Sequence, residues 1–261
     1  MPDTASPRRE RRSTRAALRA AAVDALVEPV LARAQRETGG HEGRALVVDL
    51  GGGAGTYSVR LAEHGHDVVV VDPSPDALAA LDRRAREAGV AERVRGHQGD
   101  ARQLAGLLER PVDVLLCHDV LELVDDPAAT LADVAGVLGP GGSLSLLTAQ
   151  RSGAVALRAA AGRVEEALAV LTDPDGRAGP DDPLLRRLDA AATADLLRHA
   201  GLAVVDVVGV PVLADLVPEA VVDPDPRLRE ALQRLEAAAL GHADLRGVAS
   251  HLHWHAVRAG G

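Results

Sequence analysis

The 261-residue sequence predicts an α/β fold built around a doubly wound, mainly parallel β-sheet. Short apolar runs alternate with helical patterns through residues 45–148, as in consecutive β-α-β units. Several of these runs are continuously apolar, which is typical of strands buried on both faces of a sheet. A glycine-rich segment, Gly51–Gly55, directly follows the first run. Ligands of such sheets lie at the carboxyl ends of the strands, so we expect a binding site at this loop.

The first half of the chain follows this alternation element by element. The expected strands are 45–50, 67–72, 93–98, 112–117 and 143–148, and the expected helices are 14–36, 56–64, one starting at 75, a short one from 101, and 127–138. Ser74 is a preferred N-cap residue, and Pro75 follows it at the first helical position. The breaker-rich segment Gly139–Gly142 ends the last of these helices.

After residue 150 the pattern changes. Helices are expected at 154–171 and 190–200, on either side of a loop rich in Pro, Gly and Asp. Two late strands, 202–208 and 250–257, flank a final helix at 226–240. The last strand carries His251, His253 and His255, which the strand period places on one face. We interpret these histidines as strand surface and expect no metal site.

The composition excludes several classes of function. The chain has one Cys and a net charge of −9, it lacks Lys, Asn, Ile and Phe, and it has one Tyr and one Trp. These counts exclude a disulfide framework, a Cys-built zinc site and lysine-based catalysis. The negative charge argues against broad non-specific binding of nucleic acid. The N-terminal arginines form either a solvated terminus or an arm that reaches toward an anionic ligand; they are Arg8, Arg9, Arg11, Arg12, Arg15 and Arg19.

The chain shows neither a membrane span nor a secretory signal. No apolar run approaches the roughly 18–20 residues that cross a bilayer. The first 17 residues are polar and rich in arginine, without the apolar core of a signal peptide. The sequence therefore predicts a cytoplasmic protein with no membrane partner.

The glycine loop lies between two acidic residues. Asp49 precedes Gly51 by two residues, and Asp72 lies at the tip of the second strand, where it can bind a ribose. The glycines at 51, 53 and 55 are spaced by two, whereas a dinucleotide-binding turn needs a final gap of three. An acid at the loop suits a cofactor with ammonium and sulfonium groups and would repel a pyrophosphate. A nicotinamide-dependent oxidoreductase is therefore disfavoured, and a tight turn over a buried capping Asp, with no ligand, is the remaining alternative.

These motifs resemble those of the class I S-adenosylmethionine-dependent methyltransferases. Their acid-x-Gly-x-Gly-x-Gly motif is matched by 49–55, their ribose-binding acid by Asp72, their adenine segment by Gly99-Asp100-Ala101, and their L-x-P-G-G turn by 138–142. The resemblance implies a Rossmann-like, seven-stranded sheet that is mostly parallel with an antiparallel last strand, a helical cap, and S-adenosyl-L-methionine as cofactor. It also implies a single domain over 1–261, with a basic arm and helix (1–40), a cofactor-binding half (41–150) and an acceptor-side half (151–261) that contains a helical insertion at 151–190.

Within this class the chain is most similar to the bacterial tRNA 5-carboxymethoxyuridine methyltransferases. The similarity includes the loop at 49–55, the Glu63–His66 turn and the His118–Glu122 segment. It implies methyl transfer to an oxygen, with a carboxylate on a modified tRNA uridine as one candidate acceptor. The cofactor-binding residues that the two resemblances imply are Arg19, Asp49, Gly51, Gly52, Gly53, Asp72, Asp100, Ala101 and His118.

The sequence assigns no firm catalytic residue. His118 could be a general base, a residue that packs on the cofactor, or a structural imidazole. We favour packing, because a carboxylate acceptor needs no base and a sulfonium is already an activated leaving group. Asp119 and Glu122 are weaker candidates and are interpreted as surface or capping acids.

The acceptor side departs from the tRNA-modifying family. The loop at 173–183 carries four acids, Asp173, Asp175, Asp181 and Asp182, against one arginine, and aromatic side chains that could stack on bases are nearly absent. Arginines in this region are interpreted mostly as helix surface; they are Arg151, Arg158, Arg163, Arg186 and Arg187. The acceptor is therefore left open between tRNA and a small metabolite, and a non-catalytic, cofactor-binding regulator is a further alternative.

Overall fold

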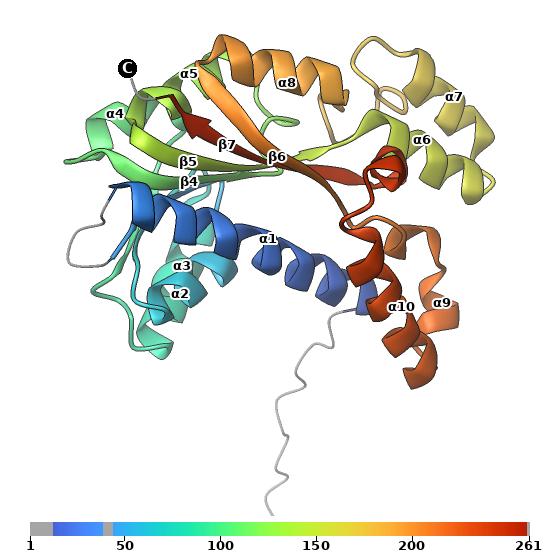
Figure 1. Cartoon of the computed structure of the whole chain (residues 1–261), viewed down its shortest axis with the longest axis horizontal. Coiled ribbons are helices and arrows are strands. Elements are labelled where there is room, and N and C mark those ends of the chain that lie inside the picture. Colours follow the sequence, from blue (N-terminus) through green and yellow to red (C-terminus); the bar gives the residue numbers. More distant parts are fainter. Residues whose placement is uncertain (1–12, 39–43, 260–261) are drawn as a thin grey trace, which may run out of the picture.

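The apolar runs of the sequence become the strands of one twisted β-sheet. The computed structural model describes residues 13–38 and 44–259, and within them the sheet has seven strands (Figure 1). These are β1 (Leu46–Leu50), β2 (Asp67–Asp72), β3 (Val94–Gln98), β4 (Val112–His118), β5 (Leu138–Ala149), β6 (Leu202–Val210) and β7 (His251–Arg258). Their order is β3-β2-β1-β4-β5-β7-β6, and β7 runs antiparallel to both of its neighbours. The expected mostly parallel sheet with an antiparallel last strand is confirmed.

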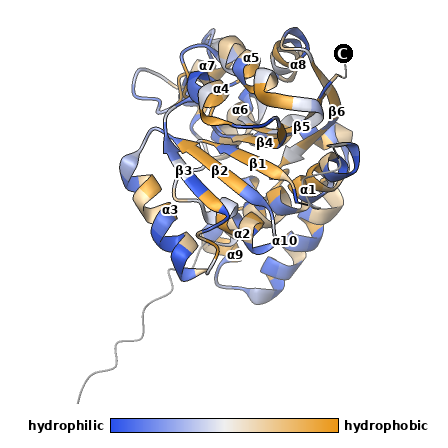
Figure 2. Cartoon of the chain, turned by 90° about the vertical axis from the view of Figure 1, so that its left-hand side faces the viewer, coloured by the Kyte–Doolittle hydropathy of each residue, from blue (hydrophilic) through white to orange (hydrophobic). Residues whose placement is uncertain are grey.

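Helices cover both faces of this sheet. One face carries α1 (Thr14–Thr38), α2 (Thr56–Glu63) and α3 (Pro75–Glu87), and the other carries α4 (Leu104–Leu107), α5 (Pro127–Val137) and α8 (Ala190–His199) (Figure 1). Buried Val27 of α1 and Leu81 of α3 belong to the first core, and buried Leu131 of α5 and Leu197 of α8 belong to the second. Figure 2 shows the apolar strands between helices whose outer surfaces are polar.

The remaining elements gather at the carboxyl edge of the sheet and beside α1. They are α6 (Arg151–Ala160), α7 (Val164–Thr172), α9 (Glu219–Val222), α10 (Pro226–Ala239) and the short 3-10 helices η1 (Ala101–Gln103), η2 (Ala214–Leu216) and η3 (Ala243–Val248). A third apolar cluster joins Leu18 of α1 to Ala214, Val222 and Leu232. The N-terminal end of α1 is thereby held against residues some 200 positions away in the sequence.

The structure corrects two of the expected boundaries. The helix expected at 154–171 is divided into α6 and α7, because Gly162 adopts a left-handed φ of 73° that ends a helix. The fifth strand starts earlier than expected, at Leu138, which pairs with Val112. Ser143 then pairs with Val114, so Gly139–Gly142 form a bulge inside the strand.

The arginines at 8, 9, 11 and 12 of the predicted N-terminal arm lie outside the described residues. No helix in the described part of the chain has the length and apolar character needed to span a membrane.

Candidate functional site

The glycine loop lies where the strand order reverses, between β1 and β4. Gly51, Gly53 and Gly55 have left-handed φ values of 73°, 56° and 65°. A Cβ atom on Gly55 would lie 2.0 Å from Leu81 Cδ1, and one on Gly51 would lie 2.6 Å from Val120 Cγ2. Glycine is therefore required at 51 and 55 both by backbone conformation and by the space available.

Asp49 lies beneath this loop. The hydroxyl of Ser58, at the start of α2, donates to Asp49 Oδ2, and a Cβ atom on Gly52 would lie 2.5 Å from the same oxygen. Burial raises the pKa of Asp49 to about 6, against the opposing effect of the Ser58 hydrogen bond. Asp49 thus ties the loop to the first turn of α2, and the structure places it under the loop.

Asp72 lies beside the open edge of the loop. Its Oδ2 accepts a hydrogen bond from the Gly53 N–H at 2.9 Å, and its Oδ1 accepts one from the Ser74 N–H at 2.9 Å. A Cβ atom on Gly53 would meet nothing closer than Asp72 Oδ2, at 4.0 Å. Each carboxylate oxygen keeps a free lone pair next to this opening, which suits the two hydroxyls of a ribose.

A small cavity lies between Leu50, the residue before the glycine loop, and the start of α5. It has a volume of about 250 Å³, and its wall includes Leu50, Asp100, Ala101, Val120 and Leu123. Asp100 starts η1 by accepting from the Arg102 N–H at 3.0 Å, and its hydrogen bonds to Arg102 lower its pKa. The apolar residues of this wall suit the face of a planar heteroaromatic ring, and its four acids, Asp100, Asp125, Asp126 and Asp133, can accept hydrogen bonds from the ring edge.

A buried chain of hydrogen bonds starts at His118, the last residue of β4. Its Nε2 lies 2.9 Å from Ser145 Oγ on β5, and the same oxygen lies 2.8 Å from His253 Nε2 on β7. Burial lowers the pKa of His118 to about 4 and that of His253 to about 3, so both imidazoles are neutral near pH 7. Tyr57 of α2 packs near His118, with the two ring centres 6.4 Å apart.

Arg19 reaches the same edge of the sheet from α1. Its guanidinium contacts Asp119 Oδ2 at 2.5 Å, and His251 Nε2 lies 3.5 Å from the other oxygen of Asp119. Asp119 adopts a left-handed φ of 57°, unusual for a residue other than Gly, and its N–H donates to the Leu147 carbonyl at 3.0 Å. The arginine is therefore placed at the carboxyl ends of β4 and β5, next to His118.

Two interpretations made from the sequence were wrong. Glu122 is neither surface nor capping: it is 1% exposed, accepts a hydrogen bond from the Ala149 N–H, and has its pKa raised to about 7 by burial. The histidines of β7 are not strand surface either, because His253 and His255 are buried and face Ser145 and Ser143. The sequence contains a pattern that could have indicated this burial: Ser143 and Ser145 alternate along one strand, as His253 and His255 do along the other.

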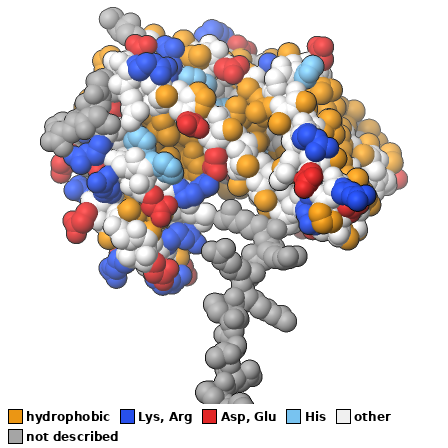
Figure 3. All heavy atoms as spheres, turned by 60° about the horizontal axis from the view of Figure 1, so that its bottom comes forward, with side chains coloured by type: hydrophobic (Ala, Val, Ile, Leu, Met, Phe, Trp, Pro, Cys, Tyr) orange, Lys and Arg blue, Asp and Glu red, His pale blue; other side chains and the backbone are white. Residues whose placement is uncertain are grey.

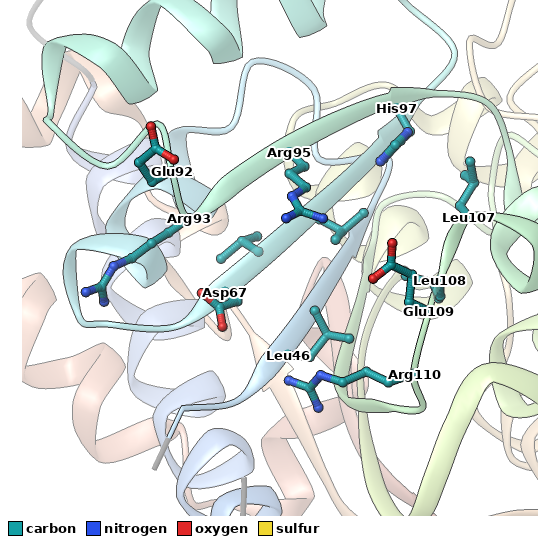
Figure 4. A pocket seen from close by; sticks show the side chains of 12 residues that line it. Leu46, Asp67, Glu92, Arg93, Arg95, His97, Leu107, Leu108, Glu109 and Arg110 are labelled. Carbon is teal, nitrogen blue, oxygen red and sulfur yellow. The ribbon is translucent and has the colours of Figure 1, made fainter. Parts of the chain in front are cut away.

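A larger cavity lies away from this site, toward the amino ends of β1–β3 (Figure 4). It has a volume of about 510 Å³, and its charged lining is made of Asp67, Glu92, Arg93, Arg95, Glu109 and Arg110. The positive charges of its three arginines equal in number the negative charges of its three acids, and none of the predicted site residues lines it.

A match to a known protein family identifies the kind of domain to which these residues belong. Residues 48–146, which contain the glycine loop, Asp72, Ala101 and His118, match the family model described as "Methyltransferase domain". The chain carries a methyltransferase domain. The sequence-based assignment to the methyltransferases is confirmed, and so is S-adenosylmethionine as the cofactor.

Known methyltransferases are similar to this chain over different lengths. The tRNA 5-carboxymethoxyuridine methyltransferase of Escherichia coli K12 is 33% identical over 174 residues, which cover 66% of this chain and 65% of that protein. The ubiquinone biosynthesis O-methyltransferase of Azorhizobium caulinodans is 37% identical over 120 residues, 43% of this chain and 46% of that protein. The chain therefore matches less than two thirds of the length of each relative.

Solved structures confirm the methyltransferase fold. Magnesium protoporphyrin IX methyltransferase from Synechocystis has a TM-score of 0.60 at 17% identity, and the match covers 94% of this chain and 86% of that one. The cyclase SpnF has a TM-score of 0.54 at 19% identity, with 84% and 76% covered.

The opening between Gly53 and Asp72 fits the cofactor of this family. The side of Gly53 on which a Cβ atom would lie is free of contacts except for the Asp72 carboxylate, and the cavity at Ala101 is lined by Leu50, next to the loop. Among the predicted cofactor residues, the structure brings Gly51, Gly52, Gly53 and Asp72 into one rim. It places Asp100 and Ala101 along the neighbouring cavity, and Arg19 and His118 at the ends of α1 and β4.

Proposed function

We propose that this chain transfers the methyl group of S-adenosylmethionine to an oxygen atom of an acceptor. The observation that carries the proposal is the open rim between Gly53 and Asp72, within a segment that matches a methyltransferase domain. Asp72 would bind the ribose and the cavity at Ala101 would hold the adenine. Arg19 would bind the carboxylate of the cofactor and would then give up its ion pair with Asp119.

The bound cofactor supplies a methyl group on a sulfonium, which makes it electrophilic. The residues of the chain then orient the reactants and keep the site dry. A neutral His118 places no second cation beside the sulfonium. With a pKa of about 4 it is also a weak base, so it favours an acceptor oxygen that is already ionised, such as a carboxylate.

Two acceptor classes follow from the relatives. A modified tRNA uridine is supported by the 33% identity to the tRNA-modifying enzyme. A small metabolite as acceptor is supported by the similarity to the ubiquinone O-methyltransferase and by the positions of the two aromatic residues, Trp254 and Tyr57. Trp254 is 2% exposed in the core, and the Arg60 guanidinium covers one face of the Tyr57 ring, 5.1 Å from its centre, which limits stacking on a base.

Calorimetry with S-adenosylmethionine and with NAD tests the cofactor assignment. We expect the first to bind, the second not to bind, and Asp72→Asn to weaken binding roughly tenfold or more, because a charged hydrogen-bond acceptor is lost. Asp76→Asn, on the exposed surface of α3, is the matched control and should bind normally. A wild-type chain that does not bind S-adenosylmethionine would refute the proposal.

Transfer of labelled methyl groups tests the reaction. Label should enter either fractionated tRNA or the small-molecule pool of a cell extract. Binding of the cofactor without any transfer would instead indicate a regulatory protein.

A further inference from the structure

A third cavity lies between the N-terminal end of α1, the C-terminal end of α6, and η2. Its volume is about 370 Å³, within the range of small-molecule sites. Its wall is made of Arg15, Leu157, Ala160, Ala161, Arg163, Asp215, Leu216 and Pro218. None of these residues belongs to the predicted cofactor site.

This cavity is adjacent to the reactive end of the cofactor site. Arg15 precedes Arg19 by four residues on α1, which is one helical turn, or about 6 Å along the axis. Asp215, on the opposite wall, is close enough to His251 to raise the pKa of that imidazole against the larger effect of burial. His251 in turn contacts Asp119, the partner of Arg19. A molecule that contacts Arg15 in the cavity would therefore lie about one helical turn from Arg19.

The lining combines apolar side chains with two guanidinium groups and one carboxylate, that of Asp215. Five of its eight residues are apolar, and Figure 3 shows hydrophobic side chains gathered on the side of the molecule where Figure 1 places α6, α7, α9 and α10. Arg15 donates to the neutral Val217 carbonyl through Nε at 3.1 Å and through Nη2, and its positive charge also helps to lower the pKa of Asp223. Arg163 is 53% exposed and shares the carboxylate of Glu166 with Arg158. Arginine binds carboxylates and other oxyanions through paired N–H groups.

We propose that this cavity binds the methyl acceptor, and that the acceptor is a small, mainly apolar molecule with one anionic group held by Arg15 and Arg163. This inference rests on the proposed methyltransferase function. The apolar body would lie against Leu157 and Leu216, and the oxygen that receives the methyl group would point toward Arg19 and His118. A splayed tRNA nucleotide is the competing occupant, but its neighbouring phosphates and bases need further cations and aromatic faces.

Photolabelling of the full-length chain tests the site with a probe of this chemistry. The probe is 4-benzoylbenzoate, an apolar anion that crosslinks to nearby C–H groups, used with and without S-adenosylmethionine. Peptide mapping should find the label within residues 157–163 and 215–218. The neutral analogue 4-methylbenzophenone should label these segments roughly fivefold less, the effect of losing one partly exposed ion pair.

Two variants separate specific from general binding. Arg163→Gln should weaken labelling by 4-benzoylbenzoate roughly fivefold and leave labelling by the neutral analogue unchanged. Arg198→Gln is the matched control, because Arg198 is also an exposed helical arginine in an ion pair and lies on α8, outside the cavity. Label spread over other segments, or equal labelling by both probes, would overturn the inference.

The same samples distinguish this inference from the proposed function. Normal binding of S-adenosylmethionine in calorimetry without labelling of the cavity rejects the acceptor site alone. Absence of S-adenosylmethionine binding rejects the methyltransferase function itself. Protection of the cavity by tRNA that also accepts labelled methyl groups overturns the small-molecule acceptor.

Discussion

The two halves of the chain are held together by different means. In residues 44–150 the loop geometry depends on backbone conformation and short side chains, as in the Asp72 bonds to Gly53 and Ser74. In residues 151–259 it depends on long charged side chains that reach distant backbone groups. Arg186 donates to the Leu121 and Val124 carbonyls, more than 60 residues away. The comparison teaches that a cofactor site can be built from local chain geometry, whereas the surface beside it needs long-range contacts.

Arginine takes a structural role throughout the second half. Arg151 donates to the carbonyls of Asp173 and Pro174, at 2.7 and 2.5 Å. Three of the five arginines are largely buried, at 18% exposed for Arg151, 15% for Arg158 and 7% for Arg187, so the expectation that most arginines here are helix surface was wrong. Cations that are used inside the fold are not available for the phosphates of an RNA.

The largest effect should come from the buried ion pair in the second half. Asp182 and Arg187 are 1% and 7% exposed, 2.6 Å apart, and the pairing lowers the pKa of Asp182 to about 2 against the opposing effect of burial. Asp182→Ala leaves a buried, unpaired guanidinium and should lower the free energy of unfolding by about 3–5 kcal/mol. Urea denaturation measures the change.

The exposed pair of Arg198 and Asp195 provides the control for that measurement. Both side chains are about two thirds exposed, so Arg198→Ala should change the free energy of unfolding by less than about 1 kcal/mol. Equal effects of the two substitutions would mean that the second half does not depend on its buried charges.

The next largest effect should come from the glycine loop. Gly55→Ala adds a methyl group 2.0 Å from Leu81 Cδ1 at a left-handed φ, and should cost about 2–4 kcal/mol of unfolding free energy. Gly89→Ala is the matched control, because Gly89 has a similar φ of 71° with nothing within 4 Å of the added atom. The control should cost only the conformational penalty, about 1 kcal/mol. A Gly55 variant as stable as the Gly89 variant would show that the loop tolerates a shift of Leu81.

The pH dependence of stability tests the histidines that join the two halves. Because the pKa of His253 falls from 6.5 in the unfolded chain to about 3 in the fold, its stabilising contribution is lost as the pH falls below 6.5. Between pH 7.5 and pH 5 this one group should lower the free energy of unfolding by about 2 kcal/mol. His253→Gln should remove that part of the pH dependence, as measured by urea denaturation at both pH values. His242→Gln, at an exposed position, should leave the wild-type dependence intact.

The smallest effect on stability should come from Arg19. Its side chain is 34% exposed and its partner Asp119 is 46% exposed, so Arg19→Gln should cost less than about 1 kcal/mol of unfolding free energy. The same variant should bind S-adenosylmethionine roughly tenfold more weakly, because a charged contact to the cofactor carboxylate is lost. Large destabilisation with unchanged cofactor binding would show that Arg19 stabilises the fold and does not bind the cofactor.

The local features of the first half could be predicted from the sequence, whereas long-range contacts could not. The strands, the N-cap at Ser74 and the reversal point at the glycine loop follow from the local order of apolar, capping and glycine residues. The burial of Glu122 could not be predicted, because its hydrogen-bond partner, Ala149, lies 27 residues away on another strand. Glu236 accepts from the N–H groups of Val212 and Ala214, contacts that likewise depend on how η2 packs on α10.

The sequence by itself determined the sheet, the glycine loop and the identity of the methyltransferase domain. Periodicity, glycine positions and nearby acids are local properties, and backbone geometry translates them directly into strands and a turn. Only the tertiary structure decided which charged side chains face the site and which hold the fold. His251 and His253 lie on β7 and Asp215 lies on η2, and these elements follow the glycine loop by more than 150 residues. Long side chains gain a role only through such partners, since an arginine or histidine has the same local pattern whether it is solvated, buried or beside a ligand.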